Sequence, residues 1–310
     1  MIASQVRPPL DASRARLPDA TGELVRDGVR IAWERFGPAT PAPGQRTILL
    51  TPTWSIIHSR FWKAQVPYLA RYFRVLTWDG RGNGRSDRPT DPAAYTDATF
   101  AEDGLAVLDA NDTPSAVVVG LSYGAHWTLL LAADHPDRVD GAVFIGASLP
   151  YLSPAGSAHV GADFHEVRDA YEGWGRYNAH SWRQDYDGYV KFFFPQCFTE
   201  PHSTKQIEDC IGWAHETDPE TLIRTVTTTG IDDRPTLEAL AARVRCPALV
   251  IHGTDDAVTG YRHGVDLSRL VHGQLLALRG AGHIPLARDP VAVNLALRSF
   301  TESLPARRIG

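Results

Sequence analysis

Residues 120–124, Gly-Leu-Ser-Tyr-Gly, place a serine between two glycines where a helical pattern begins. The apolar run Ala116–Val119 precedes them and is typical of a buried strand. A strand-to-helix turn this tight strains the backbone of its central residue and projects that side chain above the sheet. The Ser122 hydroxyl would then lie at the positive end of a helix, where developing negative charge is stabilised. The pattern predicts that Ser122 is a nucleophile; its alternative role is a helix N-cap.

A serine hydroxyl becomes a strong nucleophile only when a base takes its proton. The chain has twelve histidines, and His283 is the best placed because it follows the glycines of residues 280–282, after the last expected strand and before the last helix. Such a loop suits a side chain that is presented inward. His126 lies one helical turn after Ser122 but points along the helix, so we expect it to pack in the interior or line a pocket. We therefore predict that His283 is the base.

The base in turn needs a carboxylate that fixes its tautomer and supports the imidazolium. Asp255 and Asp256 follow the apolar run Ala248–His252 through a Gly-Thr pair, so either could lie at the end of a strand. The residues alone leave both candidates open.

A tetrahedral intermediate also needs two N–H donors that face the developing oxyanion. Tyr123, the residue after the nucleophile, is expected to supply one of them. The second should come from residues 52–55, Pro-Thr-Trp-Ser, which follow another apolar run. Pro52 has no N–H, so the donor is Thr53 or Trp54.

Short apolar runs alternate with amphipathic helical patterns along most of the chain. Strands buried on both faces read as such runs, and their alternation with helices predicts right-handed crossovers and a mostly parallel sheet. A hairpin is expected over Glu23–Phe36, around Asp27-Gly28. The other predicted strands are Thr47–Thr51, Phe73–Trp78, Ala116–Gly120, Ala142–Ile145, Ala248–His252 and Leu275–Arg279. The predicted helices are Phe61–Tyr72, Phe100–Asn111, Gly124–His135, Leu237–Val244 and Val291–Ser303.

Two regions depart from a single uniform domain. Residues 1–20 are polar and aperiodic and are expected to form a flexible arm, whereas 21–150 and 234–310 form the core. Residues 151–233 lack a buried strand pattern and are rich in aromatic residues, which predicts a helical insertion, or cap, over the carboxyl ends of the strands. Most of these aromatic residues should build the core of the cap and the others should line a pocket: Phe164, Tyr171, Trp174, Tyr177, Trp182, Tyr186, Tyr189, Phe192, Phe193, Phe194, Phe198 and Trp213.

The composition limits the kinds of molecule that we expect the chain to bind. The chain has 310 residues, is 43% hydrophobic and carries a net charge of −5, which gives no footprint for nucleic acid or an anionic membrane surface. It shows no targeting segment and no apolar run of bilayer length. Three cysteines without metal-ligand spacing indicate a reduced, cytoplasmic protein. We expect a small-molecule substrate, no cofactor and no metal; a homodimer stays open.

These residues together resemble the α/β-hydrolase fold over nearly the whole chain beyond residue 20. The resemblance implies an α/β architecture: a mostly parallel eight-stranded sheet flanked by helices, with a helical cap inserted after strand 6. The order Ser, Asp, His agrees with this fold. The family acid usually stands three residues after the glycine, which selects Asp256. The matching segments are 120–124, 253–256, 282–283 and Asp-Gly-Arg-Gly-Asn-Gly-Arg-Ser at 79–86, whose arginines the resemblance makes loop-fixing rather than catalytic.

The chain departs from the family pattern at one point. Most relatives have His-Gly where this chain has Pro52-Thr53, with the oxyanion donor directly after. Aligning Trp62 with the aromatic residue common in the next helix makes Trp54 the donor, at the cost of a one-residue insertion. A serine nucleophile also argues against haloalkane dehalogenases and epoxide hydrolases, which use aspartate at that position.

The expected activity is hydrolysis of an ester, thioester or lactone of a small, partly apolar or aromatic substrate, through an acyl-enzyme on Ser122. Two alternatives stay open, because a shared fold does not fix the reaction. One is carbon–carbon bond hydrolysis, or a lyase or cyclase reaction of secondary metabolism, on the same triad. The other is a nearly inactive ligand-binding protein, which only the altered segment at Pro52-Thr53 favours.

Overall fold

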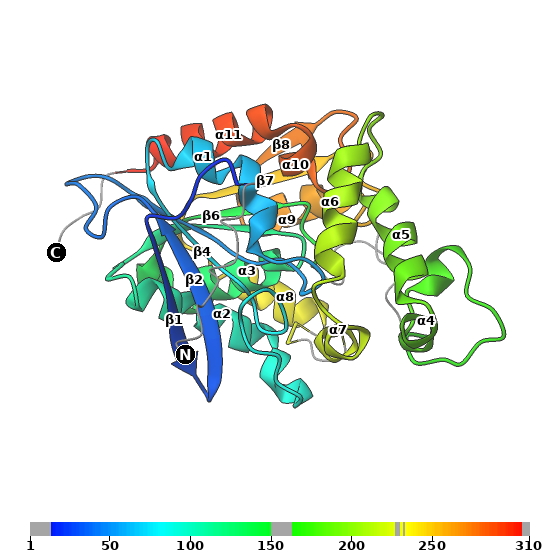
Figure 1. The fold of residues 1–310 in the computed structure, drawn as a ribbon. Helices are drawn as coiled ribbons and strands as arrows, with labels where there is room; N and C mark the ends of the chain where they lie inside the picture. The colour runs from blue at the N-terminus through cyan, green and yellow to red at the C-terminus, as the bar shows by residue number, and fades with distance from the viewer. Residues whose placement is uncertain (1–13, 150–162, 227–229, 232, 306–310) are drawn as a thin grey trace, which may run out of the picture.

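The computed structural model describes residues 14–149, 163–226, 230–231 and 233–305. Its centre is an eight-stranded sheet in the order β1-β2-β4-β3-β5-β6-β7-β8 (Figure 1). Strand β2 pairs antiparallel with β1 and β4, and every other pairing is parallel. The mostly parallel sheet predicted from the sequence is therefore confirmed. The strands are β1 (Ala20–Arg26), β2 (Val29–Phe36), β3 (Thr47–Leu50), β4 (Arg74–Trp78), β5 (Ala116–Leu121), β6 (Val139–Ile145), β7 (Ala248–Gly253) and β8 (Gln274–Leu278).

The hairpin between β1 and β2 turns at the two residues that the sequence indicated. Asp27 has a φ of 52° and Gly28 a φ of 76°, so both lie in the left-handed region. A two-residue turn with both central residues there matches the twist of the flanking strands. The hairpin adds the two antiparallel strands at one edge of the sheet.

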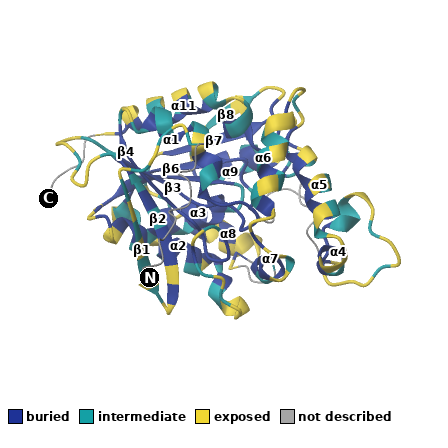
Figure 2. Ribbon diagram, in the orientation of Figure 1, coloured by how far each residue is buried: buried dark blue, intermediate teal, exposed yellow. Residues whose placement is uncertain are grey.

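Helices cover both faces of the sheet, as Figure 1 shows with α1 and α11 on one side and α2, α3 and α8 on the other. The central strands β3, β4, β5 and β7 are buried along their whole length, which explains their continuous apolar runs (Figure 2). The core helices are α1 (Val66–Leu69), α2 (Asp97–Asp109), α3 (Gly124–Asp134), α8 (Arg234–Ala241), α9 (Arg262–Leu270), α10 (Pro285–Arg288) and α11 (Pro290–Ser303), with short 3-10 turns η1 (Ser59–Ala64), η2 (Pro92–Tyr95) and η3 (Pro136–Arg138).

Between β6 and α8 the described chain is helical. It forms η4 (Gly173–Arg176), α4 (Ala179–Gln184), α5 (Tyr186–Cys197), α6 (Thr204–Ala214) and α7 (Pro219–Val226). We call α4–α7 the insertion helices; they gather at one end of the sheet in Figure 1. Trp182 and Tyr189 are completely buried, so these two aromatic residues build the interior of the insertion. Parts of the predicted cap, 151–162, 227–229 and 232, lie outside the described residues, as do 1–13 of the predicted arm.

One predicted helix is interrupted. The sequence pattern gave a continuous helix over Phe61–Tyr72, but the structure has η1 and then the single turn α1, with a break at Gln65. Pro67 lies in the first turn of α1. It has no N–H with which to continue a ladder from the preceding turn, so a new helix must begin there. Among the described helices, none has the length and apolar character needed to cross a bilayer.

Candidate active site

Ser122 stands between the end of β5 and the start of α3 with a φ of 53°, in the left-handed region. Its N–H donates to the Ile145 carbonyl at 2.9 Å, which fixes the turn against β6. The flanking glycines are required by close contact: a Cβ on Gly120 would lie 2.2 Å from the Gly124 oxygen, and one on Gly124 would lie 2.5 Å from the Pro52 oxygen. Local sequence therefore builds the strained turn that presents the hydroxyl.

Three side chains that are far apart in the sequence meet at the carboxyl ends of β5, β7 and β8. His283 Nε2 lies 2.9 Å from Ser122 Oγ, and His283 Nδ1 lies 2.8 Å from Asp256 Oδ2. His283 and Asp256 are buried, whereas Ser122 is partly exposed. The distances allow a proton to pass from the hydroxyl to the imidazole while the carboxylate holds the other ring nitrogen.

The two neighbouring aspartates have different environments in the structure. Asp255 is exposed, and its carboxylate accepts a hydrogen bond from Thr254 at 2.8 Å. Asp256 is buried, and its Oδ1 accepts the N–H groups of Val258 and Thr259, each at 2.8 Å. Burial raises the pKa of Asp256, but the charge of His283 and the hydrogen bonds from His252 and His283 outweigh it and hold the pKa well below the usual range. Asp256 is therefore ionised and oriented toward His283.

His252 is a second histidine beside this carboxylate, and the sequence analysis treated it only as a strand residue. Its Nε2 lies 2.7 Å from the Thr259 carbonyl oxygen and 3.1 Å from Asp256 Oδ2. The side chain is completely buried, and no described group pairs with its Nδ1. Nε2 therefore carries the ring proton, which lies between the Thr259 carbonyl and the Asp256 carboxylate. The spacing of four residues between His252 and Asp256 was the only sequence signal.

A helix of the insertion holds the loop that carries His283. The backbone N–H of His283 donates to the carbonyl of Cys197, the last residue of α5, at 2.9 Å. The N–H of Ile284 points to the same oxygen at 3.4 Å. Cys197 is buried, and its side chain is a free thiol. The backbone of the histidine loop is thus supported by a helix end that lies 86 positions earlier in the chain.

The segment after β3 approaches Ser122 from the strand next to β5. Thr53 Oγ1 donates to the carbonyl of Leu121, the residue before Ser122, at 2.9 Å. Trp54 is buried, and its Nε1–H donates to Thr225 Oγ1 in α7 at 2.9 Å. No described acceptor pairs with the backbone N–H of Thr53, Trp54 or Tyr123. All three groups stay available, so the choice between Thr53 and Trp54 is still a prediction.

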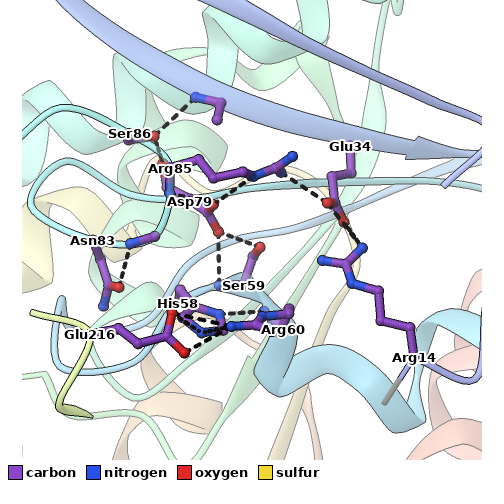
Figure 3. Close-up of polar contacts among 12 residues, drawn as sticks. Arg14, Glu34, His58, Ser59, Arg60, Asp79, Asn83, Arg85, Ser86 and Glu216 are labelled. Carbon is purple, nitrogen blue, oxygen red and sulfur yellow. Dashed lines mark hydrogen bonds and ion pairs between the residues drawn. The ribbon is translucent and has the colours of Figure 1, made fainter. Parts of the chain in front are cut away.

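The motif at 79–86 braces this segment, as Figure 3 shows. Asp79 Oδ1 accepts the N–H and the hydroxyl of Ser59, and its Oδ2 accepts the Arg85 N–H at 3.0 Å. Asn83 Nδ2 donates to the Ser55 carbonyl at 2.5 Å. Burial raises the pKa of Asp79, but these hydrogen bonds and Arg85 hold it below its usual value. An ionised carboxylate therefore fixes the chain that follows the expected oxyanion donors.

The insertion also contacts this region. Glu216, in the connection between α6 and α7, accepts from Arg60 Nη2 at 2.9 Å and lies 3.3 Å from Nε2 of the buried His58 (Figure 3). Thr217 Oγ1 donates to the Gly82 carbonyl at 3.0 Å. Burial and the neighbouring Arg60 lower the pKa of His58, although Asp79 and Glu216 oppose them. The insertion is thus joined to the loops that follow β3 and β4.

His126 does more than the expected packing. It is buried, and its Nδ1 lies 2.9 Å from Asp97 Oδ2, while its Nε2 lies 2.7 Å from the Ser148 carbonyl oxygen. It does not contact the Ser122 hydroxyl, which His283 holds. Among the described residues, no group of three or more His, Cys, Asp or Glu side chains has an arrangement that could hold a metal ion.

Comparison with protein families gives a match over residues 46–171 to the model described as the alpha/beta hydrolase fold. A non-heme chloroperoxidase of Streptomyces lividans is 25% identical, over 89% of this chain and 98% of its own length. A provisionally named carbamate hydrolase of Caulobacter segnis is 35% identical, but the match covers only 34% of this chain and 39% of that relative. The chain thus spans less than two fifths of that relative.

Comparison with solved structures gives matches over almost the whole chain. An esterase from Rhodococcus sp. ECU1013 superposes with a TM-score of 0.74 and 24% identity, over 91% of this chain and 98% of its own. A hydrolase from Pseudomonas aeruginosa superposes with a TM-score of 0.70 and 25% identity, over 92% and 99%. The overall fold therefore has counterparts among solved structures.

Proposed function

The chain belongs to the α/β-hydrolase superfamily, and we propose that it is a serine hydrolase that cleaves an ester, thioester or lactone. The observation that supports this most is the continuous hydrogen-bonded series from Ser122 through His283 to Asp256, with distances of 2.9 and 2.8 Å. The left-handed φ of Ser122 adds to it, because such strain is kept where a structure must present a side chain.

In the proposed reaction Ser122 Oγ attacks the substrate carbonyl carbon and passes its proton to His283 Nε2. The ionised Asp256 stabilises the imidazolium that forms. When the tetrahedral intermediate collapses, the bond to the leaving group breaks and the same proton goes to the leaving oxygen or sulfur. Water then attacks the acyl-enzyme while His283 again accepts and returns a proton, which releases the acid and restores the Ser122 hydroxyl.

The oxyanion of each tetrahedral intermediate is proposed to accept the backbone N–H groups of Tyr123 and Trp54. Both groups are without a described acceptor; Tyr123 lies in the turn of Ser122, and Trp54 lies in the loop after β3, the neighbouring strand. Thr53 is the alternative second donor. Loss of one such donor typically costs about 10²–10³ in kcat, so this half of the site has a large share in the rate.

The substrate is proposed to be small and partly apolar or aromatic. Tyr123 is partly exposed next to Ser122, and the Trp54 ring, which stacks on it, also contacts the rings of Tyr177 and Phe193. Aromatic walls with few polar groups bind ring or chain substituents. The names of the relatives, a carbamate hydrolase and a chloroperoxidase, do not select one acyl group.

A fluorophosphonate probe tests the proposal. Prompt labelling of Ser122 in the wild type, lost in Ser122→Ala and strongly slowed in His283→Ala, is the expected result. Asp255→Asn is the matched control and should label at the wild-type rate, because its carboxylate is exposed. A folded wild type that resists the probe would favour a ligand-binding protein instead.

Substrate panels then separate hydrolysis of esters from other chemistry on the same triad. Aryl esters, lactones and acyl thioesters are incubated with the enzyme, and acyl-enzyme is trapped and weighed by mass spectrometry. A mass increase on the peptide that contains Ser122 is expected for at least one class. Labelling by the probe without turnover of any panel member would favour the carbon–carbon bond alternative.

A further inference from the structure

Three aromatic rings lie in a row behind the nucleophile. The rings of Tyr123 and His126 are stacked with centroids 5.0 Å apart and planes at 18°. The rings of Trp54 and Tyr123 are stacked with centroids 6.1 Å apart and planes at 26°. Tyr123 is thus the middle ring, and its two neighbours come from different parts of the fold. We call His126, Tyr123 and Trp54 the ring stack.

The outer end of the ring stack is clamped by the insertion. The Trp54 ring contacts Tyr177, Trp182 and Phe193, with centroids 5.8, 5.6 and 5.8 Å away. Its Nε1–H donates to Thr225 in α7. Aromatic pairs at these separations attract one another beyond simple burial of their area. The indole therefore has little freedom to move away from Tyr123.

His126, at the inner end of the ring stack, forms an ion pair with Asp97. Both ring nitrogens of His126 face acceptors: the Asp97 carboxylate at 2.9 Å and the Ser148 carbonyl at 2.7 Å. A carbonyl oxygen and a carboxylate can only accept, so each nitrogen must carry a proton and the ring is an imidazolium. Asp97 is itself fixed, since it also accepts from Trp127 Nε1 at 3.1 Å. A cation then lies flat against the face of Tyr123, an arrangement that is attractive.

The protonation behaviour agrees with this geometry. Burial lowers the pKa of His126, but the charge of Asp97 and the hydrogen bonds to Asp97 and Ser148 outweigh it and raise the pKa above its ordinary value. Burial raises the pKa of Asp97, but His126 and the hydrogen bonds from Gly230 and Trp127 outweigh it and hold the pKa below its ordinary value. Asp97 from α2 and Tyr123 are the titratable groups described against the His126 ring; the charge of Asp97 favours the protonated ring, and the Tyr123 ring stacks on it.

The pair of His126 and Asp97, which we call the anchor, is also connected to the turn of Ser122. The N–H of Ser148, whose carbonyl His126 binds, points to the backbone carbonyl of Ser122 at 3.3 Å. His126 itself is in the first turn of α3, where its N–H donates to the Tyr123 carbonyl at 3.0 Å. The His126 ring therefore reaches the Ser122 turn through Ser148, and its backbone reaches the same turn through Tyr123, while neither touches the reacting atoms.

We propose that His126, held by Asp97, is a positioning residue that fixes the two oxyanion-hole loops relative to each other through the stacked rings of Tyr123 and Trp54. The inference rests on the proposed function, because it takes the backbone N–H groups of these two residues as the oxyanion donors. It also gives a reason for the departure from the family pattern at 52–54. The aromatic residue in that loop supplies a side-chain contact that holds its own N–H in register with that of Tyr123.

The experiment compares His126→Gln with a matched control, His135→Gln. His135 also lies at the end of α3 and pairs with Glu102 of α2 at 2.9 Å, but it is at the far end from the nucleophile. In His126→Gln we expect kcat on an aryl ester to fall by about 10- to 100-fold with KM nearly unchanged, since misplacing a donor loses part of its 10²–10³ share. In His135→Gln both constants should stay at the wild-type values.

A second pair of variants avoids the buried charges, in case His126→Gln folds poorly. Tyr123→Leu removes the middle ring but keeps the backbone N–H, and it should lower kcat more than it raises KM. Tyr123→Phe restores a ring and should recover most of that loss. In the wild type, ¹⁵N NMR at pH 7 should show a proton on both nitrogens of His126, which a packing role alone would not require.

The outcomes are distinct. If Ser122 in the wild type resists the fluorophosphonate, the proposed function fails. If the wild type labels promptly, and folded His126→Gln and Tyr123→Leu label and turn over at its rate, the positioning role is wrong while the proposed function stands. A neutral His126 ring would overturn the anchor.

Discussion

The backbone N–H of His283 is bonded to the carbonyl of Cys197 at 2.9 Å, so the end of α5 holds the loop of the histidine whose ring Asp256 orients. The imidazole is therefore fixed twice, at its ring from the core and at its backbone from the insertion. Gly282 makes this approach close: a Cβ there would lie 2.8 Å from the Cys197 oxygen and 2.9 Å from the Thr199 nitrogen.

The first prediction is that Gly282→Ala separates the histidine loop from α5. Both obstructing atoms are backbone, so the loop must shift, and a displacement of about 1 Å can cost up to about 10²-fold in rate. We expect kcat to fall by about 10- to 100-fold with a smaller change in KM, measured with an aryl ester. Gly212→Ala in α6 is the control, because a Cβ there meets nothing within 4 Å. A Gly282→Ala enzyme with wild-type kcat would contradict the support by Cys197.

The second prediction concerns the two adjacent aspartates. Asp256→Asn keeps the shape of the side chain but removes the charge that orients His283, and it should lower kcat by about 10²–10⁴-fold, the upper value being that of a known triad. Asp255→Asn should leave kcat unchanged, because that carboxylate is exposed. Steady-state kinetics on the purified variants distinguishes them. Equal losses in both would mean that the acid is wrongly assigned.

The third prediction is a pH dependence of stability. The pKa of His126 is raised in the folded state, chiefly by Asp97 acting against burial. Its stabilisation is therefore complete below the unfolded pKa of about 6.5 and is lost as the pH rises through the higher folded value. His126→Gln should be less stable than the wild type by about 1.5–3 kcal/mol near pH 6, and the gap should narrow toward pH 9. Urea unfolding across this range measures it; a gap that widens with pH would oppose the assignment.

The fourth prediction tests a motif arginine. Arg81 donates to both oxygens of Asp103, at 2.6 and 2.9 Å, and both side chains are almost completely buried. Removing Asp103 takes away the two close contacts of the buried Arg81 and leaves it only the exposed Asp27 at 3.9 Å and the Arg26 carbonyl, so Asp103→Ala should lower the free energy of unfolding by about 3–5 kcal/mol. Asp109→Ala is the control. Its pair with Arg138 is largely exposed, so its effect should be at most about 1 kcal/mol.

Local sequence patterns predicted most of the fold. The residues at 120–124 predicted the turn at Ser122 because its strain and its glycine contacts depend on neighbours in the chain. The apolar runs predicted strands because a strand that is buried on both faces reads as a continuous run of apolar residues. The helix predicted over Phe61–Tyr72 was wrong at Gln65, where the apolar period continues but Pro67 interrupts the hydrogen bonds.

Contacts between distant segments could not be predicted in this way. The pairing of Asp97 with His126, and the approach of Cys197 to His283, join elements whose relative placement depends on the packing of the whole domain. Nothing in the type of residue 197 marks it, because its backbone carbonyl makes the contact and any residue has one. The His252 side chain was similarly hidden within an apolar strand.

The bond from Cys197 to the histidine loop has a consequence for engineering. Residues 163–226 are an attractive segment to exchange between relatives when a different substrate range is wanted. In this chain a graft that ends α5 differently would also displace the backbone oxygen that holds the His283 loop, so a chimera could bind a new substrate well and still react slowly. A successful exchange would keep the native junction at the end of α5 and vary only the helices beyond it.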